Sequence, residues 1–294
     1  MMYRFLLPLI AALTLTTCQH ETRLPVSMAM CSGQPAAEKQ AAALCHDPIA
    51  AFADFANDAE FRNAHPTPAS IAPVLNGISV SYPVAGGPDG KGYLVKAASS
   101  TSRRCLLLFH EWWGLNDYVK QEADYWSKEL NINVLAVDLY DGKVGATPDE
   151  AGQLMKNNDA KRSVAIIEGA AKSMGKKAKF YTMGWCFGGG WSLKASLALK
   201  KKAVGCVMYY GMPEKDVETL KKLSPNVLFI HAQKDKWIND EVVAEFEKNM
   251  KAAGKNLEVH RYDADHAFAN PSGQRYHEPS AVAARNVVKK FLSN

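Results

Sequence analysis

The stretch Gly-Trp-Cys-Phe-Gly-Gly-Gly at residues 184–190 decides the fold, because it joins two segments of opposite character. Residues 177–183 before it are typical of a buried strand, and residues 191–200 after it favour a helix. Cys186 is therefore predicted on a sharp strand-to-helix turn, where hydrolases with the pattern Gly-x-Ser-x-Gly carry a serine nucleophile. Glycine at 184 and 188 suits such a turn, because side chains there would collide with neighbouring backbone.

Two other interpretations of this turn stay open from the motif alone. A glycine-rich turn between a strand and a helix also binds phosphate groups. A cysteine in such a turn is often only a small, buried hydrophobic residue. Residues elsewhere in the chain are needed to choose among the three.

Apolar runs that alternate with amphipathic stretches from residue 78 onward predict an α/β fold. The later apolar runs are uninterrupted and separated by helical segments, which indicates a mostly parallel sheet of about eight strands flanked by helices. The predicted strands cover residues 78–82, 92–96, 104–110, 133–137, 179–184, 204–210, 226–232 and 257–262. The predicted helices cover residues 118–130, 148–156, 160–173, 190–200, 214–223, 241–253 and 279–291.

Residues 1–18 are predicted to be a signal peptide. A positive charge at Arg4 precedes an apolar run that is too short to span a bilayer. The end of this run, Leu-Thr-Thr-Cys at residues 15–18, resembles a bacterial lipobox in which Cys18 is lipidated, although Thr17 departs from the usual Gly, Ala or Ser. Lipidation at Cys18, ordinary signal cleavage and an uncleaved amphipathic N-terminal helix all stay open. We expect an exported protein of the bacterial periplasm or outer membrane, attached to the membrane if Cys18 is lipidated.

Residues 19–70 are predicted to be an N-terminal linker or helical extension, ahead of a hydrolase domain over residues 71–294. The segment is rich in Ala, Pro, Ser and Thr. Within it, residues 48–61 resemble a helix and carry three phenylalanines that can dock on the main domain.

Composition limits the class of protein. The chain has 294 residues, of which 47% are hydrophobic, enough for one large α/β domain. Its formal net charge of +5 is small and its lysines are dispersed, so nucleic-acid binding is not indicated. No Cys-x-x-Cys or histidine-rich spacing predicts a metal site, and no cofactor is expected.

The remaining cysteines have different predicted surroundings. Cys31 and Cys45 lie close together in a polar segment, so they can pair if the protein is exported. Cys105 and Cys206 lie within apolar runs and are predicted to be core residues.

Asp235 and His266 follow Cys186 in the chain order nucleophile, acid, histidine. Asp235 comes just after an apolar run, at the strand end where catalytic groups of α/β sheets gather, and His266 lies in a loop after the last predicted strand. An imidazole can take the proton of a thiol, and a carboxylate can fix the imidazole tautomer. Each residue alone is ordinary for a turn or loop, and Asp263 and Asp265 are competing acids. Their order along the chain favours a triad.

The segment His-Glu-Trp-Trp-Gly-Leu-Asn at residues 110–116 directly follows a predicted strand. This position matches the early loop that supplies an oxyanion-hole amide, so the backbone N–H groups of Trp112 and Phe187 are candidates for that role. Glu111 lies among aromatic residues, which suggests a site residue. Taken alone, it is also consistent with a surface carboxylate or a helix cap.

Together these residues resemble the dienelactone hydrolase family of the α/β-hydrolase superfamily. The resemblance covers about residues 77–294 and rests on residues 110–116, 138–140, 184–189, 235 and 265–268. It implies an α/β-hydrolase fold and a small-molecule ester or lactone substrate, cleaved by a triad of Cys186, His266 and Asp235. It also implies that Glu111 contacts the resting thiol, moves when substrate binds and helps to generate the thiolate.

One position departs from the family pattern. Characterised members bind the carboxylate of the lactone through arginines, one of them four residues after the catalytic histidine, where this chain has Asn270. Arg275 is near but at a different spacing. The natural substrate therefore stays open.

Two alternatives to a thiol hydrolase remain. The first is a non-catalytic envelope lipoprotein that uses the same fold as a binding module, which the intact triad residue types argue against. The second is hydrolysis by a serine, but Ser192 is predicted inside a helix rather than on the turn.

Overall fold

A computed structural model describes residues 47–70, 72–98 and 103–293 of the chain. The predicted signal peptide, Cys18 and the Cys31–Cys45 pair lie outside these residues. The strands are β1 (Ile78–Tyr82), β2 (Gly90–Val95), β3 (Arg104–Phe109), β4 (Asn133–Asp138), β5 (Lys179–Trp185), β6 (Ala203–Tyr209), β7 (Asn226–Ala232) and β8 (Leu257–Tyr262). The helices are α2 (Pro48–Ala53), η1 (Asp54–Asn57), α3 (Ala59–Ala64), α4 (Asp117–Leu130), α5 (Pro148–Lys156), α6 (Ala160–Ser173), α7 (Phe187–Leu199), η2 (Lys200–Lys202), α8 (Val217–Leu220), α9 (Asp240–Ala252) and α10 (Glu278–Ser293).

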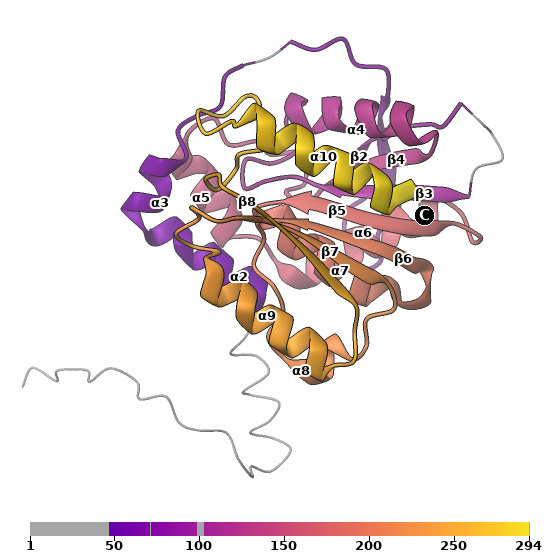
Figure 1. The fold of residues 1–294 in the computed structure, drawn as a ribbon. Helices are drawn as coiled ribbons and strands as arrows, with labels where there is room; N and C mark the ends of the chain where they lie inside the picture. The colour runs from indigo at the N-terminus through magenta and orange to yellow at the C-terminus, as the bar shows by residue number, and fades with distance from the viewer. Residues whose placement is uncertain (1–46, 71, 99–102, 294) are drawn as a thin grey trace, which may run out of the picture.

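The strands form one 8-stranded sheet with the order β1-β2-β4-β3-β5-β6-β7-β8. The two pairs that involve β2 are antiparallel, and all other pairs are parallel. Helices α4 and α10 pack together on one face, and α6 and α7 pack together on the other (Figure 1). The predicted mostly parallel sheet with flanking helices is confirmed, because uninterrupted apolar strands need cover on both faces.

Two helix predictions were wrong in their bounds. The helix predicted over residues 190–200 begins earlier, at Phe187, because strand β5 turns directly into α7 at Cys186. The helix predicted over residues 214–223 shrinks to the 4 residues of α8. There the Glu214 side chain accepts hydrogen bonds from the backbone N–H groups of Lys215 and Asp216, which competes with helix formation.

The turn between β5 and α7 is held by close contacts between backbone atoms. A Cβ atom on Gly184 would lie 2.1 Å from the carbonyl oxygen of Gly188, and one on Gly188 would lie 2.2 Å from that of Phe109. Only glycine allows this approach. Cys186 itself has φ 57° and ψ −122°, a strained conformation for a residue with a side chain. The predicted sharp strand-to-helix turn at Cys186 is therefore present, at the carboxyl end of a central strand.

The segment before the sheet packs into the hydrophobic core. Phe52 and Phe61 are fully buried, and Phe55 is half-buried against them. Lys194 of α7 forms an ion pair with Asp47 at 2.6 Å, which ties the start of this segment to the helix behind the turn. In Figure 1 the segment, in indigo, lies along the edge of the domain near α5. The helix-like stretch predicted at residues 48–61 is thus three short helices rather than one.

The predicted core cysteines, Cys105 and Cys206, are confirmed as buried. Ser192 is also buried, inside α7, where its hydroxyl donates to Thr182. It faces the core and not the turn. None of the helices in the described part of the chain has the length and apolar character needed to cross a bilayer.

Substitution of Gly184 by alanine tests the backbone contact at the turn. The new methyl group has to displace backbone atoms, so we expect the free energy of unfolding to fall by at least about 3 kcal/mol in urea titration. Gly273→Ala is the control, because a Cβ there would meet only an ordinary contact at 3.4 Å. Equal stability of the two variants would mean that the turn has room for a Cβ atom at residue 184.

Candidate active site

Three predicted site residues lie at the carboxyl ends of parallel strands in one sheet. Cys186 follows β5, Asp235 lies just beyond β7, and His266 lies in the loop after β8. Nδ1 of His266 lies 2.5 Å from Oδ2 of Asp235, and both side chains are fully buried. The competing acids are both exposed, and Asp263 pairs with Lys234. Asp235 is therefore the acid that holds His266.

Asp235 is itself fixed by the backbone. Its Oδ1 atom accepts hydrogen bonds from the N–H groups of Trp237 at 2.9 Å and Ile238 at 3.0 Å. Burial raises the pKa of Asp235, but attraction to His266 and these hydrogen bonds outweigh burial and hold the pKa below its ordinary value. An ionised Asp235 only accepts, so Nδ1 of His266 carries a hydrogen and donates it to Oδ2, and Nε2 is the ring nitrogen on the other side. That Nε2 is buried and has no hydrogen-bond partner in the described structure.

The Cys186 thiol faces Glu111 and two backbone amides. Burial and the charge of Glu111 hold the pKa of Cys186 well above its ordinary value, whereas hydrogen bonds from the N–H groups of Phe187 and Trp112 act in the opposite direction. The two amides predicted for an oxyanion hole therefore converge on the sulfur. The thiol makes no hydrogen bond with Nε2 of His266, so the arrangement is that of a protonated, resting thiol.

The loop that carries Glu111 and Trp112 is held by a histidine whose role the sequence did not reveal. His110 bonds through Nδ1 to the carbonyl oxygen of Glu111 at 2.6 Å, and its Nε2 accepts from the N–H of Leu139 at 3.2 Å. Burial lowers the pKa of His110, in keeping with a neutral ring that donates at one nitrogen and accepts at the other. The bonds fasten the loop to the end of β4.

The carboxyl group of Glu111 is buried, and among the described residues its one hydrogen-bond partner is Asn270. The Asn270 amide donates to Oε2 of Glu111 at 2.7 Å, while Oε1 has no partner in the described structure. Burial raises the pKa of Glu111 to about 7, because the neutral amide compensates the carboxylate only in part. Asn270 therefore lines the candidate site, whereas in the sequence it stands out only as the absence of an arginine.

The space above the thiol is small. A cavity of about 30 Å³ is lined by Cys186, by residues 111–113, by residues 267–275 in part, and by residues 64–68 in part. Such a volume holds little more than a water molecule, whereas ligand pockets usually measure hundreds of cubic ångströms. One of these walls therefore has to move before an ester can reach the sulfur.

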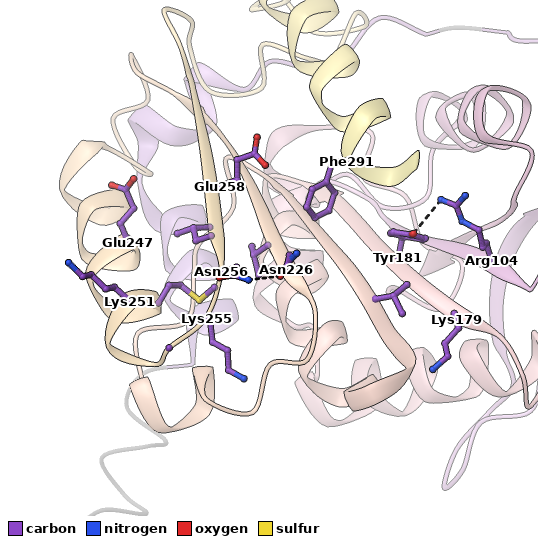
Figure 2. A pocket seen from close by; sticks show the side chains of 15 residues that line it. Arg104, Lys179, Tyr181, Asn226, Glu247, Lys251, Lys255, Asn256, Glu258 and Phe291 are labelled. Atoms are coloured by element: carbon purple, nitrogen blue, oxygen red, sulfur yellow. Dashed lines mark hydrogen bonds between the residues drawn. The ribbon is translucent and has the colours of Figure 1, made fainter. Parts of the chain in front are cut away.

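A much larger hollow lies elsewhere in the described part of the chain. It has a volume of about 1210 Å³, and Arg104, Lys179 and Asn226, which begin strands β3, β5 and β7, line it (Figure 2). This is the amino end of the parallel strands, opposite to the edge that carries Cys186. The hollow contains none of the predicted site residues.

Residues 91–294 match the model of the dienelactone hydrolase family. The chain belongs to this family. Family membership places it among the carboxylic ester hydrolases. The match begins after the α2–α3 segment and β1, so residues 47–70 lie outside it.

Relatives and solved structures agree with this assignment. The chain is 26% identical over 225 residues to a protein of Aquifex aeolicus named "Putative carboxymethylenebutenolidase", covering 70% of this chain and 95% of the relative. It is 27% identical over 200 residues to "Protein usf" of Aquifex pyrophilus, covering 64% and 86%. The fold is similar to that of a dienelactone hydrolase-like promiscuous phosphotriesterase from metagenomic libraries, with a TM-score of 0.65, 18% identity, and coverage of 75% of this chain and 98% of that chain.

Replacement of Glu111 by glutamine tests whether burial raises the pKa of this carboxyl in the folded protein. Between its ordinary pKa of 4.5 and about 7, the unfolded state releases the proton while the folded state retains it, so wild type loses stability as the pH rises. We expect the free energy of unfolding of Glu111→Gln, relative to that of wild type, to increase by about 3 kcal/mol between pH 4 and pH 8, measured by urea unfolding.

Glu168→Gln, on an exposed position of α6, serves as the control and should show no such growth. If the difference in free energy of unfolding between Glu111→Gln and wild type stays constant with pH, the carboxyl ionises as easily in the folded protein as in the unfolded chain.

Proposed function

We propose that this protein hydrolyses small esters or lactones with Cys186 as the nucleophile, His266 as the general base and acid, and Asp235 as the carboxylate that orients His266. The observation that carries the proposal is the buried 2.5 Å contact between Asp235 and His266, on the same sheet edge as a strained cysteine turn. A carboxylate in this position fixes the imidazole tautomer and stabilises the imidazolium that forms during the reaction.

The reaction begins with activation of the thiol. The side chain of Cys186 turns from Glu111 toward Nε2 of His266, which takes the thiol proton. Movement of Glu111 away from the sulfur assists this step, because its negative charge opposes the thiolate. The single hydrogen bond of Glu111 to Asn270 supports such a movement, since little else holds the carboxylate in place.

The later steps follow from the same groups. The thiolate sulfur attacks the ester carbonyl carbon, and the carbonyl oxygen takes the negative charge beside the N–H groups of Trp112 and Phe187. His266 gives its proton to the leaving alcohol as the carbon–oxygen bond breaks, which leaves a thioester on Cys186. A water molecule, deprotonated by His266, then attacks the thioester and releases the acid and the thiol.

The position of Arg275 favours a substrate that carries an anionic group. It is half-buried, lines the cavity above Cys186 and lies 5.5 Å above the ring of Trp237. Burial lowers the pKa of this arginine, which means that its charge is partly desolvated and that a carboxylate would compensate it. Arg275 thus offers a cation in the site although Asn270 replaces the arginine of characterised family members.

Replacement of Cys186 by alanine removes the nucleophile. We expect turnover of p-nitrophenyl butyrate to fall by at least about 1000-fold, because the remaining amides and histidine cannot form the acyl-enzyme. Cys105→Ala is the matched control, since this thiol is buried in β3. Unchanged turnover in Cys186→Ala would overturn the assignment of Cys186 as the nucleophile. Absence of turnover in wild type would favour a binding module that has kept the fold.

We also propose that the protein is exported and that Cys18 carries a lipid. The support is the sequence alone, namely the short apolar run after Arg4 and the lipobox-like residues 15–18. Produced in a bacterial host, the wild type should enter the detergent phase of a Triton X-114 partition, and Cys18→Ala should not. A wild-type protein that appears in the periplasm and stays in the aqueous phase would indicate ordinary signal cleavage.

A further inference from the structure

His65, at the end of α3, lies in the site although it precedes the residues that match the family. It lines the same cavity as Cys186 and is only 7% exposed. Its ring centre lies 5.1 Å from that of His266, 5.5 Å from that of Trp112 and 5.4 Å from that of Trp237. The N-terminal segment therefore supplies one polar side chain to the cavity wall beside the histidine of the proposed triad.

Several contacts fix the position of this ring. His65 packs against Phe61 with ring centres 4.1 Å apart, and its Nδ1 lies 2.6 Å from the carbonyl oxygen of Phe61. The chain on either side is tied down as well, by the ion pair of Arg62 with Asp149 at 3.2 Å and by the hydrogen bond from the N–H of Ala69 to the carbonyl oxygen of Ser272 at 2.8 Å. The ring is held in one orientation before any substrate arrives.

The hydrogen bonding of the ring defines its chemistry. A carbonyl oxygen only accepts, so Nδ1 of His65 carries a hydrogen. Burial, followed by the neighbouring His266, lowers the pKa of His65 to about 3, so the ring is neutral near pH 7. Nε2 is then a pure acceptor, and it is buried without a hydrogen-bond partner in the described structure.

Such an atom is a recognition element rather than a base. A ring with so low a pKa is a poor proton acceptor, and no carboxylate bonds to its Nδ1 as Asp235 bonds to that of His266. A buried acceptor without a donor is unfavourable, and a ligand that brings a donor relieves this penalty. The same site discriminates against ligands of equal size that lack the donor.

We propose that His65 is a specificity-determining residue whose Nε2 accepts a hydrogen bond from a hydroxyl or amide N–H group on the substrate, close to the carbonyl that Cys186 attacks. The substrate class is therefore an ester or lactone that carries a hydrogen-bond donor near its reacting carbonyl, such as a hydroxy acid ester. This inference rests on the proposed function of Cys186.

The test compares esters that differ by one hydroxyl group. For wild type, kcat/KM on the p-nitrophenyl ester of 2-hydroxybutyrate or of 3-hydroxybutyrate should exceed that on p-nitrophenyl butyrate by at least about tenfold. In His65→Phe, which keeps an aromatic ring but removes the acceptor, this ratio should approach one. His65→Gln, which retains an acceptor, should keep part of the preference and covers the case in which His65→Phe does not fold.

His260→Phe is the control, because His260 lies on the outer strand β8 and bonds to Glu258. Its ratio should equal that of wild type. Two outcomes overturn the inference: a wild-type ratio near one for both hydroxy esters, or a folded His65→Phe variant that keeps the full wild-type ratio.

A binding measurement separates this inference from the proposed function. The dissociation constants of the same esters for Cys186→Ala, followed by tryptophan fluorescence, should show the same preference, and the double variant with His65→Phe should lose it. If wild type cleaves none of the three esters but Cys186→Ala binds a hydroxy ester at least about tenfold more tightly than the butyrate ester, the proposed function fails and the inference on His65 stands. If all three esters are cleaved at equal rates, the proposed function stands and the inference fails. Absence of both cleavage and preferential binding overturns both.

Discussion

The site depends on the approach of three backbone segments at the end of β5. Gly184, Gly188 and the carbonyl oxygen of Phe109 are so close that no Cβ atom fits between them. This contact turns the chain within one residue and leaves Cys186 in a strained backbone conformation. It also sets the first N–H group of α7 beside the sulfur and brings the end of β3, with its loop, against the same atom. The geometry around the thiol is therefore set by contacts between backbone segments.

Burial then sets the electrostatics of the site. Cys186, Glu111 and Asp235 are all removed from water, and only Asp235 has an ionisable partner, His266, within hydrogen-bond distance. Negative charge is consequently stable on Asp235, whose pKa is lowered, and unfavourable on Cys186 and Glu111, whose pKa values are raised. Burial of this kind disfavours the reactive thiolate. In the mechanism that we propose, the thiol becomes reactive when the sulfur leaves the neighbourhood of Glu111 and reaches the imidazole.

The sequence predicted most of the fold because the central strands are uninterrupted apolar runs, which require a covered parallel sheet. It failed at residues 214–223, where the side chain of Glu214 competes for backbone N–H groups in a way that periodicity does not report. For the candidate site, chain order predicted Cys186, Asp235 and His266, and the structure brings Asp235 and His266 into contact. The contact between Glu111 and Asn270 joins residues 159 positions apart, and the sequence contains no signal for it. His65 was missed for a similar reason: its segment has the composition of a linker, and its contacts with Trp112 and Trp237 arise only on folding.

The strand ends and the N-terminal segment contribute different parts of the candidate site. The residues of the proposed triad lie at the ends of β5, β7 and β8, where a rigid sheet holds them to the tolerance that proton transfer needs. Part of the cavity wall comes instead from the N-terminal segment, which packs through Phe52 and Phe61 against His266 and precedes the family match. A change in that segment alters the shape and hydrogen bonding of the cavity without disturbing the strand ends. Under the proposed function, substrate choice can therefore diverge from that of the relatives while the proposed nucleophile, acid and histidine remain the same.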